Sequence, residues 1–417
     1  MRVKTKQKTV RLVVKFGGSS LSSPRKISRA ADAVREEIES GTQTAVVVSA
    51  MGRTTDSLLE TASAVSLPSR SNQVDEVISM GERTSAKIFQ AVLSSRGVDS
   101  RCFDPDDDEW PIMTNDSFGD ASPVLSISRP RIQRYVLPYL EEGIVPVLPG
   151  FVGRTADGRI TTMGRGGSDI TAFLLARCLL ADESVLVTDS NGLMTADPKL
   201  VRDARPISEI SIRELIGLAD SGTKFLKGKA LRYLDDSFRV RITSNVAGSL
   251  RSGGTVISGG FPSSVAAELE SPQPSMMITV TGKNISQNPS IMKEMLSKVT
   301  DEKSKILGLS ANSDSLIIYV PVQGGKQLVK KLHASVLKHQ ETTAMAVRDD
   351  LCIIKIVGLG LVETPGLIAS VSEPLKKNSL NVYGIFTIAS SILLLVDWSQ
   401  HQKALRLVRR SLKEVTT

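Results

Sequence analysis

The chain has 417 residues, of which 23% are charged, and its 52 basic and 44 acidic residues give a net charge of +8. This length predicts two or three domains, and the composition excludes wholesale disorder, collagen-like repeats and a disulfide scaffold. Residues 1–11 carry +5 and residues 399–417 carry +4, which leaves the segment between them near neutral at −1. Nucleic-acid binding requires clustered Lys and Arg on a folded face, so we expect no nucleic-acid partner.

Cysteine, histidine and hydropathy exclude further classes of protein. The 3 cysteines lie far apart without a CxxC pair, which argues against a zinc site and favours a reducing, cytoplasmic compartment. Only three apolar residues separate the basic N-terminus from Lys15, too few for a signal peptide, and the apolar stretch 385–396 is shorter than the ~20 residues of a membrane span. The 3 histidines all follow residue 330, so chemistry placed earlier uses no His base, catalytic triad or His-bound metal.

The first 260 residues alternate short apolar strands with longer amphipathic helices. Strands are predicted at 12–15, 44–49, 145–148 and 184–187, and helices at 25–40, 168–180 and 210–219. This alternation predicts a mostly parallel sheet covered by helices on both faces. Ligands of such sheets bind at the carboxyl ends of the strands, so the loops that follow the strands are the candidate site.

The composition changes at residues 258–274, where glycine and proline cluster and predict a domain junction. Two passages with a shared layout follow. One runs from a strand at 276–280 through Pro289 and a helix to a strand at 315–320, and the other runs from 352–357 through Pro365 and a helix to 392–396. They predict a duplicated small α+β module, which suits ligand sensing or dimerisation better than catalysis.

The loop after the first strand contains Gly17 and Gly18, directly behind Lys15. Such a loop binds phosphate only if its amides can approach the anion and a cation lies nearby. The chain contains neither GxxxxGK[ST] nor GxGxxG. The loop is therefore either a phosphate cradle or a tight strand-to-helix turn, and the residues alone leave both open.

The run Gly-Arg-Gly-Gly-Ser-Asp at 164–169 is more specific. A helix N-cap accounts for Ser168 and Asp169 but not for the neighbouring glycines and arginine. Arg165 offers a planar fork suited to a carboxylate, and Asp169 is placed to orient a lysine or a metal-bound phosphate. The loop after the fourth strand, with Thr188 and Asp189, is either a second site loop or a simple turn.

Gly81 and Glu82 are interpreted as the start or an interruption of a helix, where a lone glutamate is more often on the surface.

The chain resembles the aspartokinases, members of the amino-acid kinase family with C-terminal ACT domains. The resemblance rests on seven motifs that follow one another in the order usual for that family. They are VKFGGSS at 14–20, VSAMG at 48–52, MGER at 80–83, GFVG at 150–153, TMGRGGSD at 162–169, TD at 188–189 and TADP at 195–198. The resemblance implies an α/β amino-acid kinase domain at 1–260, with an open, mostly parallel sheet sandwiched by helices. It also implies two α+β ACT-like (ferredoxin-like) units at 270–345 and 346–417.

The resemblance further implies the site residues, with ATP and Mg²⁺ as cofactors and no protein metal ligand. Lys15, Asp169 and Lys224 would be catalytic, with Asp169 organising the lysines. Glu82 would bind the ammonium of L-aspartate and Arg165 its α-carboxylate. The full ATP set is Lys15, Gly17, Gly18, Thr188, Asp189, Met194, Lys199, Lys224 and Phe225, and the substrate set is Ser49, Thr55, Glu82, Arg165 and Ser168.

The implied reaction phosphorylates the β-carboxylate of L-aspartate to 4-phospho-L-aspartate, the first step of lysine, threonine and methionine biosynthesis. A carboxylate is already ionised at neutral pH, so the attacking group needs no general base, which agrees with the placement of the histidines. The implied partners are ATP, L-aspartate, an amino-acid effector at the ACT domains and further copies of the chain, as a dimer or tetramer. Membrane and nucleic-acid partners are not expected.

The chain also departs from the family pattern. Lys227 and Gly228 replace the usual His-Pro pair, Met194 stands where tyrosine is common, and Lys199 stands where arginine is common. A lysine keeps the charge of an arginine but loses its bidentate fork. Residues 387–389 lack the usual Thr-Ser-Glu, which leaves feedback inhibition open. The alternative function is a catalytically weak, amino-acid-sensing regulatory subunit.

Overall fold

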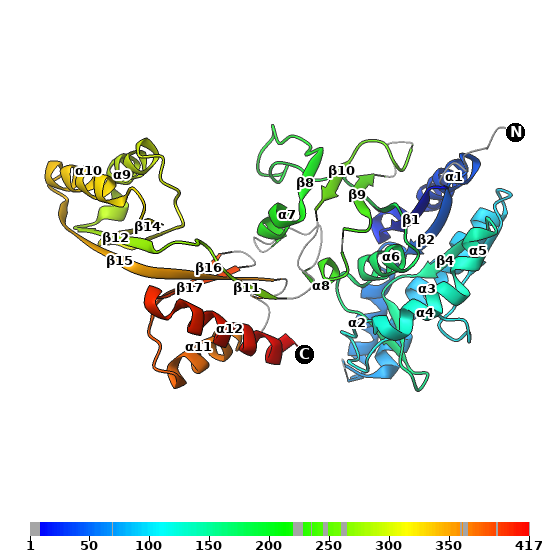
Figure 1. Cartoon of the computed structure of the whole chain (residues 1–417). Helices are drawn as coiled ribbons and strands as arrows, with labels where there is room; N and C mark the ends of the chain where they lie inside the picture. Colours follow the sequence, from blue (N-terminus) through cyan, green and yellow to red (C-terminus); the bar gives the residue numbers. More distant parts are fainter. Residues whose placement is uncertain are drawn as a thin grey trace, which may run out of the picture. The chain divides into compact units, whose positions relative to one another are not determined.

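The computed structural model of the chain describes residues 9–68, 70–219, 228–234, 236–244, 249–259, 265–358, 361, 366–388 and 391–416. Lys224, Phe225 and Lys227 lie outside the described residues. The chain divides into two compact units, Met1–Ser263 and Ser264–Thr417, which Figure 1 colours from blue to green and from green to red.

The first unit is built on an eight-stranded sheet. Neighbouring strands follow the order β3-β4-β2-β1-β7-β9-β10-β8, and each described pair is parallel except β9 with β10. A separate antiparallel hairpin pairs β5 with β6. The strands are β1 (Arg11–Phe16), β2 (Gln43–Val48), β3 (Ser100–Cys102), β4 (Val145–Pro149), β5 (Val152–Arg154), β6 (Ile160–Thr162), β7 (Glu183–Thr188), β8 (Glu209–Ser211), β9 (Arg239–Ser244) and β10 (Thr255–Ser258).

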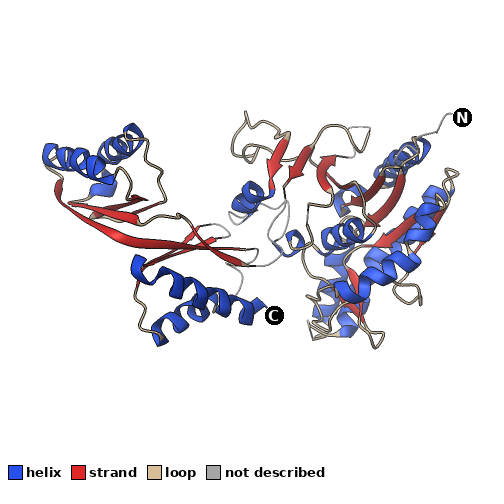
Figure 2. Cartoon of the chain, viewed as in Figure 1, coloured by secondary structure: helices blue, strands red, loops and turns tan. Residues whose placement is uncertain are grey.

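Helices cover both faces of this sheet, as the alternation of strands and helices predicts (Figure 2). On one face, Val14 and Phe16 of β1 pack with α1 and α3, and the ring of Phe16 lies 5.3 Å from that of Phe89. On the other face, α6 contacts β1, β2 and β7. The helices are α1 (Pro24–Glu39), α2 (Thr54–Ala64), α3 (Asn72–Ser94), α4 (Leu125–Tyr135), α5 (Leu137–Glu141), α6 (Gly167–Cys178), α7 (Ile212–Ala219) and α8 (Gly228–Leu231).

The predicted strands and helices of this unit are confirmed to within two residues at nearly every end. The exception to the segment pattern is α3, a 23-residue helix that runs without a break through Gly81 and Glu82. The interpretation of these residues as a helix start or interruption was therefore wrong. One glycine costs a helix only about 1 kcal/mol, and the many buried residues of α3 offset that cost.

The second unit contains one seven-stranded sheet shared by two α+β modules. The 16-residue strand β15 pairs with β12 from Thr342 to Leu351, then with β17 from Leu351 to Val357 and with β11 from Ile354 to Val357. The strands are β11 (Ala266–Leu269), β12 (Ser275–Gly282), β13 (Gly308–Ala311), β14 (Ser315–Pro321), β15 (Thr342–Val357), β16 (Val382–Ile388) and β17 (Ser391–Asp397). The helices are α9 (Pro289–Asp301), α10 (Gly325–Lys338), α11 (Leu367–Lys377) and α12 (His401–Thr416).

Each module buries its own apolar core under its own pair of helices. The cluster around Ile278 and Ile318 packs under α9 and α10, and the cluster around Ile354 and Leu394 packs under α11 and α12. The prediction of a strand at 352–357 was too short by ten residues, because most of the earlier half of β15 is exposed and lacks an apolar pattern.

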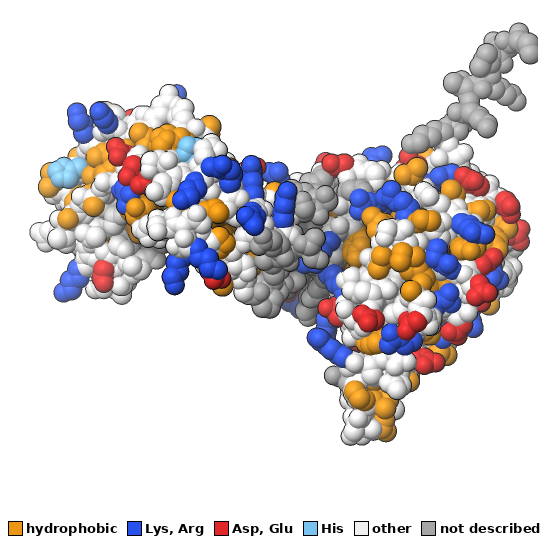
Figure 3. All heavy atoms as spheres, turned by 60° about the horizontal axis from the view of Figure 1, so that its bottom comes forward, with side chains coloured by type: hydrophobic (Ala, Val, Ile, Leu, Met, Phe, Trp, Pro, Cys, Tyr) orange, Lys and Arg blue, Asp and Glu red, His pale blue; other side chains and the backbone are white. Residues whose placement is uncertain are grey.

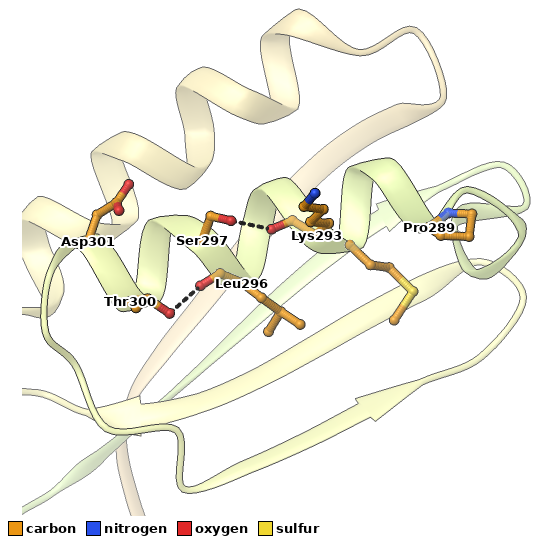
Figure 4. A pocket seen from close by; sticks show the side chains of 7 residues that line it. Pro289, Lys293, Leu296, Ser297, Thr300 and Asp301 are labelled. Carbon is orange, nitrogen blue, oxygen red and sulfur yellow. Dashed lines mark hydrogen bonds between the residues drawn. The ribbon is translucent and has the colours of Figure 1, made fainter. Parts of the chain in front are cut away.

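A groove of about 580 Å³ runs along the outer side of α9 (Figure 4). Its hydroxyl groups are satisfied within the helix, since Ser297 Oγ donates to the carbonyl of Lys293 and Thr300 Oγ1 to that of Leu296. The groove therefore offers mainly apolar contact and no titratable cluster.

Acidic and basic side chains are interspersed over the face of the first unit shown at the right of Figure 3. Within the described segments, no helix combines the length and apolar character that a membrane span requires.

Candidate active site

The loops that follow four central strands lie at one edge of the first unit's sheet. The parallel register aligns Phe16 of β1 with Val48 of β2 and Val187 of β7, and Val48 with Pro149 of β4, so the strands end nearly level. The carboxyl edge of a parallel sheet is where ligands bind in α/β folds. The residues that follow these ends include Gly17, Gly18, Ser49, Gly150 and Asp189.

Lys15 and Asp169 form an ion pair at this edge. The side chain of Lys15 alternates with those of Val14 and Phe16 and therefore points to the α6 face of the sheet. Its Nζ lies 2.7 Å from Oδ1 of Asp169, and the two side chains are only 13% and 12% exposed. Asp169 lies in the first turn of α6, where the helix dipole favours a negative charge. The two residues are far apart in sequence, and the fold brings them into contact.

The glycine loop after β1 is held tightly against its neighbours. The amide of Gly17 donates to the carbonyl of Val187 at 3.0 Å, and the amide of Gly52 donates to the carbonyl of Gly18 at 3.0 Å. A Cβ on Gly18 would lie 2.7 Å from the carbonyl oxygen of Ala50, closer than side chains tolerate. A glycine is therefore required where the loops after β1 and β2 meet.

Glu82 is a buried carboxylate on α3. It is 4% exposed, and its Oε1 accepts a hydrogen bond from Thr55 Oγ1 at 3.2 Å. Its Oε2 has no hydrogen-bond partner among the described residues. Burial is the main cause that raises the pKa of Glu82 to about 7, against weaker hydrogen-bond effects in the opposite direction. A buried acceptor without a partner suits a cationic ligand group. The surface interpretation of this glutamate was wrong, because burial of one helix face cannot be read from a single charged residue.

The loop at 164–169 joins the other strand-end loops through hydroxyl groups. Ser49 Oγ donates to Ser168 Oγ at 3.0 Å, and a Cβ on Gly150 would lie 2.7 Å from that of Ser168. Gly164 and Gly166 both adopt left-handed backbone, with φ of +69° and +85°. Arg165 is exposed between them, so its guanidinium is accessible to a ligand.

The predicted nucleotide residues beyond β7 are less enclosed. Thr188 Oγ1 donates to the carbonyl of Ser190 at 2.9 Å, which shapes the turn after the strand. Met194 is half-buried and forms an isolated antiparallel β-bridge with Pro206, whereas Asp189 and Lys199 are exposed. Within the described part of the chain, the Lys199 side chain forms no ion pair.

Two further polar residues support the site and carry no motif. Asp75 on α3 is fully buried and accepts hydrogen bonds from the amides of Gly119 (2.9 Å) and Thr162 (2.8 Å) and from Thr162 Oγ1 (2.8 Å). Burial raises its pKa despite these bonds. Lys229 on α8 binds loops that flank residues 164–169. The sequence spacing could have indicated Asp75, because it precedes Glu82 by seven residues, about two helical turns, and so lies on the same face of α3.

Comparison with known proteins identifies the chain. Residues 10–244 match the model of the amino acid kinase family. An aspartokinase of Bacillus sp. (strain MGA3) is 30% identical over 418 residues, which span 96% of either chain. The chain belongs to the amino acid kinase family, among its aspartokinases.

Solved structures agree on the fold. The aspartate kinase of Synechocystis superposes with a TM-score of 0.78 at 22% identity, over 98% of this chain and 70% of that one. E. coli aspartokinase III in complex with aspartate and ADP has a TM-score of 0.55 at 24% identity, over 96% of this chain and 99% of that one. The same enzyme in complex with lysine and aspartate has a TM-score of 0.54 at 24% identity, over 97% of this chain and 99% of that one. The predicted α/β fold class is thereby confirmed.

Proposed function

We propose that this aspartokinase transfers the γ-phosphoryl group of ATP to the β-carboxylate of L-aspartate. The observation that carries the proposal is the Lys15–Asp169 ion pair, which holds a cation 2.7 Å from its partner beside the glycine loop at the strand ends. A cation held by a carboxylate, next to backbone amides, suits a phosphate group that gains charge during transfer. The predicted role of Lys224 remains part of this proposal, as a second phosphate-binding lysine.

The substrate half of the site suits a small amino acid with two carboxylates. Glu82 is proposed to bind the ammonium group, since one of its buried oxygens has no partner in the described part of the chain. Arg165 is proposed to bind the α-carboxylate through its planar fork. The hydroxyls of Ser49, in the loop after β2, and of Thr55 and Ser168, in the first turns of α2 and α6, are proposed to complete the contacts.

In the proposed mechanism, an oxygen of the substrate β-carboxylate attacks the γ-phosphorus directly. The new O–P bond forms as the bond to the β–γ bridging oxygen breaks, and ADP leaves with that electron pair. The attacking group is ionised above a pKa of about 4, so no proton has to be removed. Lys15 neutralises negative charge on the phosphates, and Asp169 fixes where Lys15 Nζ lies. The chemistry is thus positioning and charge neutralisation.

Mg²⁺ is proposed to enter as a complex with ATP, where it would neutralise negative charge on the phosphates. Among the described residues, no group of three or more His, Cys, Asp or Glu side chains is arranged to hold a metal. Mg²⁺ usually keeps several waters and binds substrate phosphates with only one or two carboxylates.

The second unit is proposed to comprise ACT-like domains at 270–345 and 346–417 that bind an amino-acid effector and join copies of the chain. Two α+β modules that share one sheet support this proposal. The lysine complex of E. coli aspartokinase III is a precedent for an effector in a relative.

A hydroxamate assay with ATP, Mg²⁺ and L-aspartate tests the proposed function. We expect acyl-phosphate formation with aspartate and at least about tenfold less with glutamate, which is one methylene longer. Parallel reactions with lysine, threonine or methionine identify the effector. Folded protein that binds an amino acid calorimetrically and forms no acyl phosphate would instead support the regulatory-subunit alternative.

Gly18→Ala is expected to weaken ATP binding by about tenfold or more, because the added methyl group drives the loops after β1 and β2 apart and small displacements cost orders of magnitude. The KM for ATP and nucleotide titration calorimetry measure this effect. Gly217→Ala in α7 is the matched control, because the added Cβ has no atom of the described residues within 4 Å beyond its own stretch of helix. An unchanged KM for ATP in Gly18→Ala would show that the loop tolerates a side chain.

A further inference from the structure

Lys229 makes an unusually complete set of contacts for a lysine in a short helix. Its Nζ donates to the carbonyl of Asp120 (2.8 Å), to Oδ1 of Asp120 (2.6 Å), to the carbonyl of Ala121 (2.9 Å) and to the carbonyl of Met163 (3.2 Å). The side chain is 18% exposed. One ammonium group therefore joins α8 to two loops that lie well apart in sequence.

Three of the four acceptors are main-chain carbonyls, which distinguishes this contact from a surface ion pair. An exposed ion pair contributes little, because water replaces either partner at small cost. The contacts with the carbonyls of Ala121 and Met163 are partly buried, and a partly buried carbonyl that loses a charged donor keeps part of its desolvation cost. Lys229 thus acts as a tether, by which we mean that its ammonium group links α8 to residues 120–121 and to Met163.

The tethered loops border the loop of Arg165, which leads directly into the first turn of α6 with Asp169. Met163 directly precedes Gly164, and a Cβ on Gly164 would lie 2.6 Å from Oδ1 of Asp120. The amide of Ala121 also donates to the carbonyl of Thr162 at 2.9 Å. Residues 119–121 thus pack directly against the start of the 164–169 loop.

Asp75 holds the same two segments from the α3 side. It binds the amides of Gly119 and Thr162, each next to a residue that Lys229 binds. After α8, the phenol of Tyr233 is hydrogen-bonded to Ser122, which adds a second link from this region to the 119–122 loop. The loop is therefore fixed from two directions, by α3 and by α8.

We propose that Lys229 is a positioning residue that holds the 163–169 loop in its binding geometry. Through this loop it fixes Arg165, assigned to the substrate α-carboxylate, and Asp169, the partner of Lys15. Lys229 also follows Lys224, the proposed second phosphate-binding lysine, by five residues in sequence. The contacts of Lys229 therefore join the segment just after Lys224 to the loop that contains Arg165. The assignment of substrate roles rests on the proposed function, whereas the tether itself rests on the four contacts.

Lys229→Met tests the proposal, because methionine keeps the apolar stem and removes only the ammonium group. We expect the KM for aspartate to rise about tenfold and kcat to fall about tenfold, since displacement of a positioned group by a fraction of an ångström costs this much. The KM for ATP changes less. Lys229→Arg, which keeps the charge and several donors, is expected to recover part of both losses.

Lys87→Met is the control, because the Lys87 side chain is 64% exposed and its ammonium forms an ion pair with Asp104 at 3.1 Å. It is expected to retain wild-type constants. Hydrogen exchange on the full-length proteins gives a readout independent of turnover: amides of residues 119–122 and 163–169 exchange faster in Lys229→Met, and those of β1 and β2 do not.

A KM for aspartate and a kcat of Lys229→Met that both lie within twofold of wild type would overturn the proposal. So would a fall in kcat alone, with both KM values unchanged, which indicates a smaller folded fraction. If the wild-type protein does not phosphorylate aspartate, the proposed function fails, and the exchange comparison still decides whether Lys229 tethers the loop.

Discussion

Lys15→Met is expected to lower kcat by about 10²–10³-fold, the loss typical of one group that stabilises charge in a transition state. Of the two lysines proposed to bind the phosphates, Lys15 is the one that lies among the described residues, and its Nζ is held 2.7 Å from Asp169. The attacking carboxylate needs no activation, so nothing on the nucleophile side compensates for the lost cation. Initial rates over a range of ATP and aspartate concentrations measure the effect.

A double-mutant cycle with Asp169→Asn separates the role of the pair from two independent roles. If Asp169 acts by placing Lys15, the double variant loses little more than Lys15→Met alone, because residues that act as a unit are not additive. Multiplicative losses would mean that Asp169 contacts substrate or phosphate in its own right. Near wild-type kcat in folded Lys15→Met would refute the assigned role of Lys15.

Glu82→Gln is expected to raise the KM for aspartate by about a hundredfold, the ~3 kcal/mol scale of a hydrogen bond between charged groups. The pKa of Glu82 is raised to about 7, so the free protein loses the ionised form as pH falls through that value. The ammonium of aspartate requires the ionised form. For the unmodified protein, the KM for aspartate therefore rises below pH 7, about tenfold per pH unit at the limit. Glu82→Gln removes this dependence.

The same substitution is expected to stabilise the fold at high pH. A pKa raised from 4.5 to about 7 means that the folded state holds the proton more tightly than the unfolded chain does. The ionised group then destabilises the fold by about 3 kcal/mol above pH 7, and this cost disappears as pH falls to the unfolded value near 4.5. Thermal unfolding of both proteins from pH 5 to 9 measures it, with a gain in Tm for Glu82→Gln at pH 8 and a much smaller gain at pH 5. An equal Tm at pH 8 would contradict the raised pKa.

The first unit follows closely from sequence, because local patterns specify its strands and loops. Continuous apolar runs, such as the Ala-Val-Val-Val of residues 45–48, are buried on both faces of a parallel sheet, and glycine clusters mark the strand ends. Once those strands are parallel neighbours, the loops behind them have to meet at one edge. The sequence identifies both Lys15 and Asp169 as candidates, and the structure adds the 2.7 Å contact between them.

Other parts of the site could not be read from sequence. The burial of Glu82 depends on how α3 packs, and the contacts of Lys229 are mostly with carbonyl oxygens, which every residue possesses. Most of the early half of β15 is exposed, so no hydropathy pattern in the sequence predicts its pairing with β12.

The sequence by itself therefore determined the fold class, the two-part organisation and the positions of the glycine loops, since these follow from short-range periodicity and backbone conformation. Only the tertiary structure decided which charged side chains lose contact with water and which partners they then meet. The reason is physical: desolvation and ion pairing depend on groups far apart in the chain, and those two effects set the pKa of Glu82, the ion pair of Lys15 and the tether of Lys229.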